Sequence, residues 1–160
     1  MEFIDKNKIK LDKEINELDI FVITFIEIID KYTQYVIVSG YVAIILGRSR
    51  GTDDVDMIIP RISKEKLFLI YNDLLKNGFW CLNSSNIDDL YDILIKKSSI
   101  RFAIEPNVSP NMEIKFSKNS YDEISLSKPV IIELGTKEIK TSQLELQIAY
   151  KEEVLKSNKD

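Results

Sequence analysis

The sequence of 160 residues has no histidine and only one cysteine, Cys81. Without histidine the chain cannot form a Ser-His or Cys-His nucleophile pair or a His-ligated transition-metal site. A single cysteine excludes a Cys-cluster zinc site and an intrachain disulfide, and a chain without disulfides is typical of a reducing compartment. Cys81 follows Phe79 and Trp80, so we expect it to be a buried small hydrophobic residue.

The sequence also lacks the positive charge of a protein that coats nucleic acid nonspecifically. Its formal net charge is -4 and its pI is about 5.1, whereas nonspecific binding needs many phosphate-neutralising lysine and arginine side chains. A local basic patch is still compatible with this composition. Lys96, Lys97 and Arg101 could form a small basic face for RNA, or the two lysines could simply complement the dipole of a helix end.

Long hydrophobic runs are absent as well. The most apolar stretch, residues 20–29, is too short to cross a bilayer and is interrupted by Thr24 and Glu27. Residues 1–5 lack the basic and apolar pattern of a secretory signal. We therefore expect a cytoplasmic protein without a membrane partner, and a hydrophobic content of 44% over residues 1–160 is sufficient for one domain with a core.

Hydrophobic periodicity predicts alternating helices and strands, and hence an α/β domain. The spacing of apolar residues predicts helices over residues 15–31, 41–46, 63–76 and 86–95, and a last helix from residue 141 or 142 to about 155. Runs of β-branched and aromatic residues between turn signals predict strands over residues 35–38, 53–59, 79–82, 100–105, 111–116, 130–134 and 138–140. In the third helix we expect Leu67, Ile70, Leu74 and Leu75 to face inward.

Two aspartates, Asp54 and Asp56, lie two positions apart on the strand predicted for residues 53–59. Because side chains alternate along a strand, both carboxylates should share one face while Val55 and Met57 take the other. Two neighbouring negative charges repel each other, so solvent or a cation must relieve the repulsion. Mg²⁺ suits such a site because it binds a few carboxylates and completes its shell with water and phosphate oxygens.

A two-metal phosphoryl-transfer site would need a third carboxylate from a neighbouring strand. Glu113 is the best candidate, since Met112 and Ile114 on either side of it should face the core. Glu105 is the reserve candidate. The alternative is that Glu113 is a solvated strand residue paired with a lysine.

Ser39 and Gly40 follow a predicted strand and precede a short helix. The amide groups at a helix start attract anions, and glycine lets a phosphate approach the backbone closely. The alternative is an ordinary strand-to-helix turn. Arg50 could contact phosphates or an acceptor, or serve as a charge partner for the nearby aspartates.

The last predicted helix carries a polar row, Gln143, Gln147 and Lys151, inside a broad apolar arc. A polar row within a burying face suggests the wall of a cleft, in which Lys151 would meet a phosphate or one of the acids. The alternative is that Lys151 extends past its neighbours to water.

Taken together, residues 35–60 resemble the nucleotidyltransferase superfamily, in particular its small bacterial and archaeal branch with abortive-infection toxins and minimal nucleotidyltransferases. The matching pattern is a hydrophobic strand, a Gly-Gly or Gly-Ser turn, an apolar helix ending in glycine, and Arg-x-Thr-x-Asp-hydrophobic-Asp. In this sequence it is formed by Val38, Ser39, Gly40, Gly47, Arg50, Thr52, Asp54 and Asp56. The turn is Ser-Gly rather than the usual order, and the third acid would be Glu where Asp is common.

The resemblance implies a nucleotidyltransferase-like mixed sheet with helices packed mainly on one side. It implies that Asp54, Asp56 and Glu113 bind Mg²⁺ or Mn²⁺ and are catalytic, and that Ser39, Gly40, Arg50, Thr52 and Lys151 contact the phosphates of a nucleoside triphosphate such as ATP. The acceptor would be a hydroxyl of RNA (for example tRNA), of a protein or of a small molecule, and a toxin-antitoxin or phage-defence system is a setting that the resemblance suggests. Relatives often continue as a helix beyond Asp160.

Two other interpretations remain open at this point. The chain could be a noncatalytic relative, an interaction module such as an antitoxin that kept the fold and lost turnover. It could also be an unrelated α/β protein with solvated acids.

Overall fold

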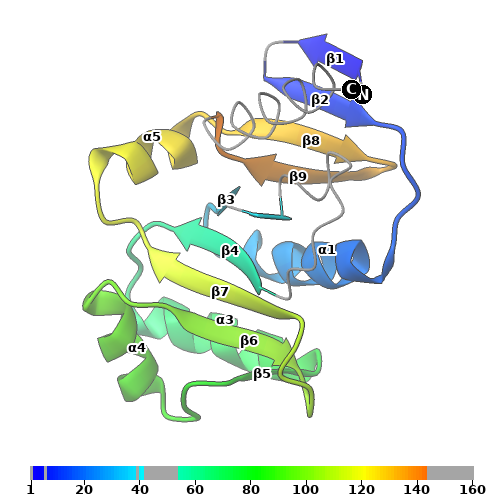
Figure 1. The fold of residues 1–160 in the computed structure, drawn as a ribbon. Helices are drawn as coiled ribbons and strands as arrows, with labels where there is room; N and C mark the ends of the chain where they lie inside the picture. Colours follow the sequence, from blue (N-terminus) through cyan, green and yellow to red (C-terminus); the bar gives the residue numbers. More distant parts are fainter. Residues whose placement is uncertain (1, 6, 39, 42–53, 144–160) are drawn as a thin grey trace, which may run out of the picture.

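The computed structural model describes residues 2–5, 7–38, 40–41 and 54–143, which form a mixed α/β fold (Figure 1). All the described strands belong to one nine-stranded sheet. The strands are β1 (Glu2–Asp5), β2 (Lys8–Leu11), β3 (Val36–Val38), β4 (Asp54–Ile59), β5 (Phe79–Cys81), β6 (Ile100–Ile104), β7 (Asn111–Phe116), β8 (Val130–Leu134) and β9 (Lys137–Thr141). The described helices are α1 (Glu17–Ile29), α3 (Lys64–Lys76), α4 (Ile87–Ile95) and α5 (Ser120–Ser127).

The order of strands across the sheet is β1-β2-β8-β9-β3-β4-β7-β6-β5. The central strand β3 is parallel to β9 and antiparallel to β4, and β4 is parallel to β7. The carboxyl ends of β3 and β9 therefore meet the amino ends of β4 and β7 at the same end of the sheet. We call this the Gly40 end, because Gly40 follows β3 there.

Three of the four described helices, α1, α3 and α4, pack on one face of the sheet and bury most of the core. In the view of Figure 1, α1 and α3 lie behind the strands. Aromatic rings join the helices to the sheet: Phe25 of α1 contacts Phe79 of β5 edge-on, with ring centroids 5.3 Å apart, and also packs against Phe102 of β6. The burial of apolar residues between these layers is the main force that holds the helices to the sheet.

The opposite face of the sheet has a smaller apolar cluster, formed by Val36, Val38, Ile58 and Leu126. Leu126 belongs to α5, so this helix covers the part of the face beside β3 and β4. The same face carries Asp54 and Asp56, because they alternate along β4 with the core residues Val55 and Met57. Polar side chains next to α5 are thus separated from the main core by the sheet itself.

Most predicted elements are confirmed with ends shifted by one or two residues. Ser63 caps α3 and Asn86 caps α4, each by accepting a hydrogen bond from a backbone N–H of the first turn. The helix predicted from residue 41 is described only at Gly40 and Tyr41, which are helical. The last predicted helix is described only at Gln143, which is helical, because Thr141 still belongs to β9 and residues 144–160 lie outside the described residues.

One prediction about the fold is wrong, and three elements were not predicted. Leu75 was expected to face inward but is 42% exposed, and Tyr71 is buried instead. The strand β6 ends at Ile104, one residue before its predicted end at Glu105. The strands β1 and β2 and the helix α5 have no counterpart in the sequence-based expectations.

Among the helices of the described residues, none combines the length and the apolar character that crossing a membrane requires.

The aromatic contact between α1 and the sheet leads to a stability prediction. Phe25 is 0% exposed, so Phe25→Ala should lower the free energy of unfolding by about 3–5 kcal/mol. The control is Phe68→Ala on α3, where the ring is 49% exposed, and we expect a change within about 0.5 kcal/mol. Urea denaturation of both variants measures the difference. Equal effects would contradict the placement of α1 against β5 and β6.

Candidate active site

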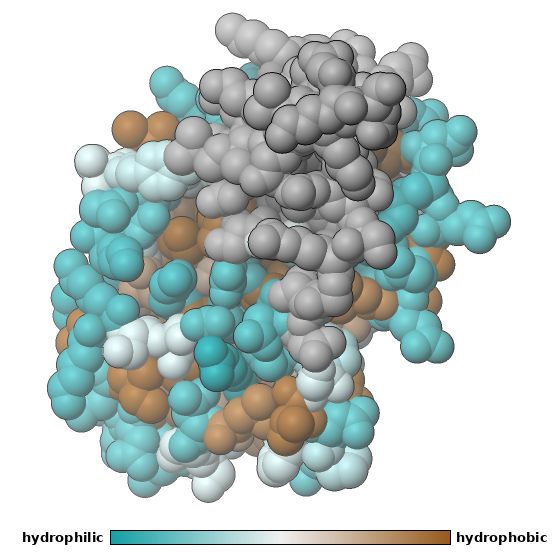
Figure 2. Space-filling view, viewed as in Figure 1, coloured by the Kyte–Doolittle hydropathy of each residue, from teal (hydrophilic) through white to brown (hydrophobic). Residues whose placement is uncertain are grey.

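The acidic residues of β4 lie directly beside polar residues of β7. The parallel register pairs Asp54 with Asn111 and Asp56 with Glu113. In β7 the neighbours of Glu113, Met112 and Ile114, belong to the main core, so Glu113 points to the same face as the two aspartates. Three carboxylates from two adjacent strands thus share one face, as the sequence predicted. In Figure 2 hydrophilic side chains lie between apolar ones over the region of β7 and β6.

Glu113 is held by groups from the neighbouring β6 segment. The hydroxyl of Ser99 donates a 2.6 Å hydrogen bond to Glu113 Oε1, and Arg101 Nη2 lies 3.5 Å from Oε2. On the other side lies Asp56, the register neighbour of Glu113 on β4. The alternative of a solvated Glu113 paired with a lysine is therefore corrected, because its side chain is only 17% exposed and its hydrogen-bond and ion-pair partners are a serine and an arginine.

These contacts lower the pKa of Glu113 below its ordinary value of 4.5. Partial burial is the largest single influence and acts to raise the pKa, because it disfavours the charged form. The hydrogen bond from Ser99, the influence of Asp56 and the positive charges of Arg101 and Lys115 together outweigh it. Glu113 is therefore a carboxylate at neutral pH and can act as a ligand for a cation.

Asp54 is held by Asn111, whose Nδ2 donates a 2.7 Å hydrogen bond to Asp54 Oδ1. The same Nδ2 contacts the carbonyl oxygen of Val108 at 3.3 Å. Asn111 is 6% exposed, and its Oδ1 is a buried acceptor without a hydrogen-bond partner in the described part of the chain. A buried polar atom left unpaired is unfavourable, and a bound ligand or water beside Asp54 would satisfy it.

The turn predicted to hold phosphate lies at the same end of the sheet as the acids. The register places Val38, the last residue of β3, beside Asp56, and Gly40 follows two residues later at the start of a helix. A triphosphate held there would thus be next to the carboxylates. Ser39 itself, Arg50, Thr52 and Lys151 lie outside the described residues.

The end of β9 brings the start of the last predicted helix to the same place. Thr141 pairs with Ile37 of β3, and its hydroxyl donates a 3.0 Å hydrogen bond to the Ile37 carbonyl. Ser142 N–H donates to the same carbonyl at 3.3 Å. Of the predicted polar row, Gln143 follows directly after this point and is exposed, and Gln147 and Lys151 lie outside the described residues.

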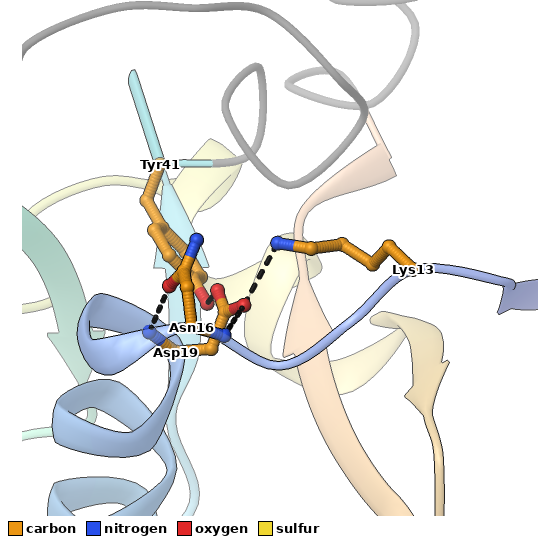
Figure 3. A network of polar contacts seen from close by, with 4 residues as sticks. All are labelled: Lys13, Asn16, Asp19 and Tyr41. Atoms are coloured by element: carbon orange, nitrogen blue, oxygen red, sulfur yellow. Dashed lines mark hydrogen bonds and ion pairs between the residues drawn. The ribbon is translucent and has the colours of Figure 1, made fainter.

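A buried network anchors the residue after Gly40 to the start of α1 (Figure 3). Asp19 is 0% exposed. Its Oδ1 accepts a 2.8 Å hydrogen bond from the Tyr41 hydroxyl, and its Oδ2 accepts from Lys13 Nζ at 2.7 Å and from Asn16 N–H at 3.1 Å. Burial, followed by the nearby charge of Asp19, raises the pKa of Tyr41, so the phenol stays protonated and remains a donor. The first turn of the helix after β3 is thereby fixed to α1.

The chemistry of the three acids fits Mg²⁺ or Mn²⁺, which prefer oxygen ligands. Their arrangement fits less fully: among the described residues no group of three or more His, Cys, Asp or Glu side chains is gathered closely enough to hold a metal ion. Asp56 and Glu113 are in contact, while Asp54 is turned to Asn111. A cation would therefore have to draw Asp54 toward the other two carboxylates.

The other residues singled out in the sequence are not ligand candidates in the structure. Glu105, the reserve third acid, is exposed in the connection after β6, whereas Glu113 lies on the strand next to β4. Arg101 pairs with Glu113, so it contributes to this site as a charge partner. Lys96 is the C-terminal cap of α4 and Lys97 follows it, and Lys96 Nζ lies 3.8 Å from Asp92 Oδ2 of this helix. The proposed RNA face of these lysines stays a prediction.

Sequence reasoning missed Ser99, Asn111, Asp19 and Tyr41. Ser99 and Asn111 are common polar residues without a motif, and only the register of β4, β7 and β6 reveals their partners. Asn16 and Asp19 form a capping box with the spacing that marks a helix start, so this signal could have identified Asp19. Nothing in the sequence points to Tyr41 as its partner 22 residues away.

The sequence matches no protein-family model, and no curated protein gives a significant match. The argument for a function therefore rests on the residues and their geometry.

Removal of the Ser99 hydroxyl tests the electrostatics of Glu113. Ser99→Ala should raise the pKa of Glu113 toward 4.5, because the hydrogen bond that favours the carboxylate is lost. In the wild type, ionisation of Glu113 contributes to the free energy of unfolding above pH 4.5, and this contribution is lost as the pH falls through the lowered pKa of the folded state. The contribution should be smaller in the variant, because its folded-state pKa lies closer to 4.5. Carboxyl NMR titration measures the shift. Ser127→Ala, which removes a hydroxyl bonded to the Ile124 carbonyl on α5, should leave the pKa unchanged. An unchanged pKa in Ser99→Ala would refute this assignment.

The anchor of Tyr41 can be tested against a matched tyrosine. Tyr41→Phe leaves one oxygen of the fully buried Asp19 without its donor, and should lower the free energy of unfolding by about 1–3 kcal/mol. Tyr35→Phe removes another buried phenol, which accepts a hydrogen bond from Lys140 N–H at 3.2 Å, and should have a smaller effect because the orphaned group is uncharged. Chemical denaturation of the two variants compares them. A larger effect for Tyr35→Phe would contradict the importance of the Asp19 network.

Proposed function

We propose that the protein is a metal-dependent nucleotidyltransferase, which moves a nucleoside monophosphate from a nucleoside triphosphate to a hydroxyl acceptor. The observation that carries the proposal is the parallel register that sets Asp56 beside Glu113, with Asp54 on the same face and Gly40 at the same end of the sheet. Three oxygen-ligand side chains next to a glycine at a helix start suit a triphosphate and its cation.

In this proposal Asp54, Asp56 and Glu113 hold Mg²⁺ or Mn²⁺. When bound, such ions supply charge stabilisation to the attacking and leaving oxygens of an in-line displacement. Gly40 lets the phosphates approach the backbone at the helix start. Ser99 and Arg101 keep Glu113 ionised and oriented, and Asn111 holds Asp54 until it turns toward the cation.

Further contacts to the phosphates are assigned to Ser39, Arg50, Thr52 and Lys151, on the basis of the family resemblance. For the acceptor we propose only a chemical class, a hydroxyl group of RNA, of a protein or of a small molecule. The resemblance to small nucleotidyltransferases also motivates a role in a toxin-antitoxin or phage-defence system.

A second candidate is a noncatalytic module with the same fold, for example an antitoxin. Two observations favour it. Glu113 already accepts a hydrogen bond from Ser99 and is paired with Arg101, and among the described residues the three acids are not close enough together to hold a metal ion. A carboxylate committed to structural partners would bind a cation weakly. This candidate predicts no metal binding and a stable complex with a partner protein.

Transfer of label from an α-labelled nucleoside triphosphate, with Mg²⁺ or Mn²⁺ present, separates the two candidates. The wild type should label an acceptor, and Asp54→Ala plus Asp56→Ala should lower the rate at least about a hundredfold, since both charges that hold the cation are removed. The control is Asp88→Ala plus Asp92→Ala on α4, where the two side chains are 70% and 73% exposed. It should retain wild-type activity. Equal labelling by the wild type and the β4 double variant would rule out catalysis at this site.

A further inference from the structure

Among the described helices, α3 exposes the most large apolar side chains. Leu69 is 55% exposed, and Phe68 and Leu75 are exposed as well. Together with Ile87 of α4, Phe68 and Leu69 line an apolar groove of about 370 Å³. Exposed apolar patches of this kind, with charged residues at their rim, commonly mark interaction sites.

The helix α3 lies between two other helices, and its outward side faces solvent. Asp73 accepts a 2.7 Å hydrogen bond from the hydroxyl of Tyr32, just beyond the end of α1, and Lys64 forms an ion pair of 2.9 Å with Asp88 of α4. At 3.6 residues per turn, nine positions place Asp73 and Lys64 on opposite sides of the helix. The buried residues, such as Leu74, take the side toward the sheet. The remaining side holds six residues that we call the outer face: Glu65, Phe68, Leu69, Asn72, Leu75 and Lys76.

The residues of the outer face are symmetric about the middle of α3. Glu65 is in the first turn and Lys76 is in the last turn. If a second α3 packs antiparallel across this face, a two-fold axis passes between positions 70 and 71. Glu65 then faces Lys76 of the second copy, and Leu69 faces Asn72 of the second copy. Phe68 falls about 3 Å along the helix axis from Leu75 of the second copy.

The charges at the two ends of the outer face are available for such a contact. Within the residues that the structure describes, neither Glu65 nor Lys76 forms an ion pair or a side-chain hydrogen bond. In an antiparallel pair, unlike charges meet at both ends, whereas a parallel pair would set Glu65 against Glu65 and Lys76 against Lys76. The face is therefore complementary to an antiparallel copy of itself.

We propose that the outer face of α3 is the interface of a two-fold symmetric dimer of this protein, in which the two α3 helices pack antiparallel. The apolar contacts of Phe68, Leu69 and Leu75 supply the attraction, and the pairs of Glu65 with Lys76 fix the direction. The inference does not depend on the proposed function. Because α3 covers the main-core face of the sheet and the acids lie on the opposite face, the dimer leaves the candidate site open.

One helix from each copy forms most of the interface, so we expect a weak dimer. A contact of this size lies below the standard interface of about 800 Å² per partner, and we expect a dissociation constant of about 10–100 µM. At lower concentrations the protein is a monomer, and the stability of Phe68→Ala measured there does not include this contact.

Sedimentation equilibrium at protein concentrations from about 1 µM to about 500 µM tests the proposal, and the wild type should change from monomer to dimer over this range. Glu65→Lys and Lys76→Glu each set like charges against each other at both ends of the interface, and each should raise the dissociation constant at least about fivefold. The double variant with both changes restores unlike pairs, and its dissociation constant should return to within about twofold of the wild-type value. Leu69→Gln, which removes an apolar contact near the axis, should also weaken the dimer at least about fivefold.

The control for the effect of a charge reversal on a helix is Glu123→Lys. Glu123 is an exposed residue in the first turn of α5, on the opposite face of the sheet. This variant should dimerise like the wild type. Thermal unfolding checks that every variant is folded.

Three results would overturn the proposal. The first is a wild type that stays monomeric at every concentration. The second is a dimer that neither charge reversal nor Leu69→Gln weakens, since its interface would lie on another face. The third is weakening by both single reversals without recovery in the double variant, which would contradict the antiparallel pairing of Glu65 with Lys76.

Discussion

The candidate site depends on one interaction, the parallel pairing of β4 with β7. Because six consecutive residue pairs are in register between the two strands, Asp56 is fixed beside Glu113, and both face away from the main core. A shift of one residue would turn Glu113 toward the core and Ile114 toward the acids. The apolar residues that alternate with the acids, such as Met57 and Ile114, hold the register because their burial on the helix face depends on it.

The pairing also creates an electrostatic problem that the surrounding residues reduce. Two carboxyl groups in contact repel each other when both are charged. Ser99 and Arg101 stabilise the charge of Glu113, and Asn111 donates to Asp54. These partners keep an acidic cluster folded without a cation, and they also compete with any cation for the same oxygens. The balance between these two effects decides whether the three acids bind a cation.

Local patterns in the sequence were sufficient for most of the fold and for the face that the acids share. Strand alternation placed Asp54, Asp56 and Glu113 correctly because the apolar residues between them are unambiguous. The helix α5 was missed because it is only eight residues long and leaves Tyr121 and Ile124 exposed, so it lacks a clear apolar stripe. The exposed Leu75 shows that helical spacing locates a face only to within one residue.

The partners of the acids could not be predicted, because they depend on contacts between distant parts of the chain. Glu113 meets Asp56 only after the chain has formed α3, β5, α4 and β6 between them, and no local signal encodes that register. The hydrogen bond between Tyr41 and Asp19 could not be predicted for the same reason, since it joins two separate elements. The position of Gly40 follows from the antiparallel pairing of β3 with β4, which sets Val38 beside Asp56.

The most direct test of the account is a titration with Mn²⁺ followed by NMR of the side-chain carboxyl signals. The paramagnetic ion broadens only the signals close to it. The account predicts that the signals of Asp54, Asp56 and Glu113 broaden first and together, before those of exposed acids such as Asp88. Simultaneous broadening of exposed acids across the surface, with Glu113 unaffected, would contradict it.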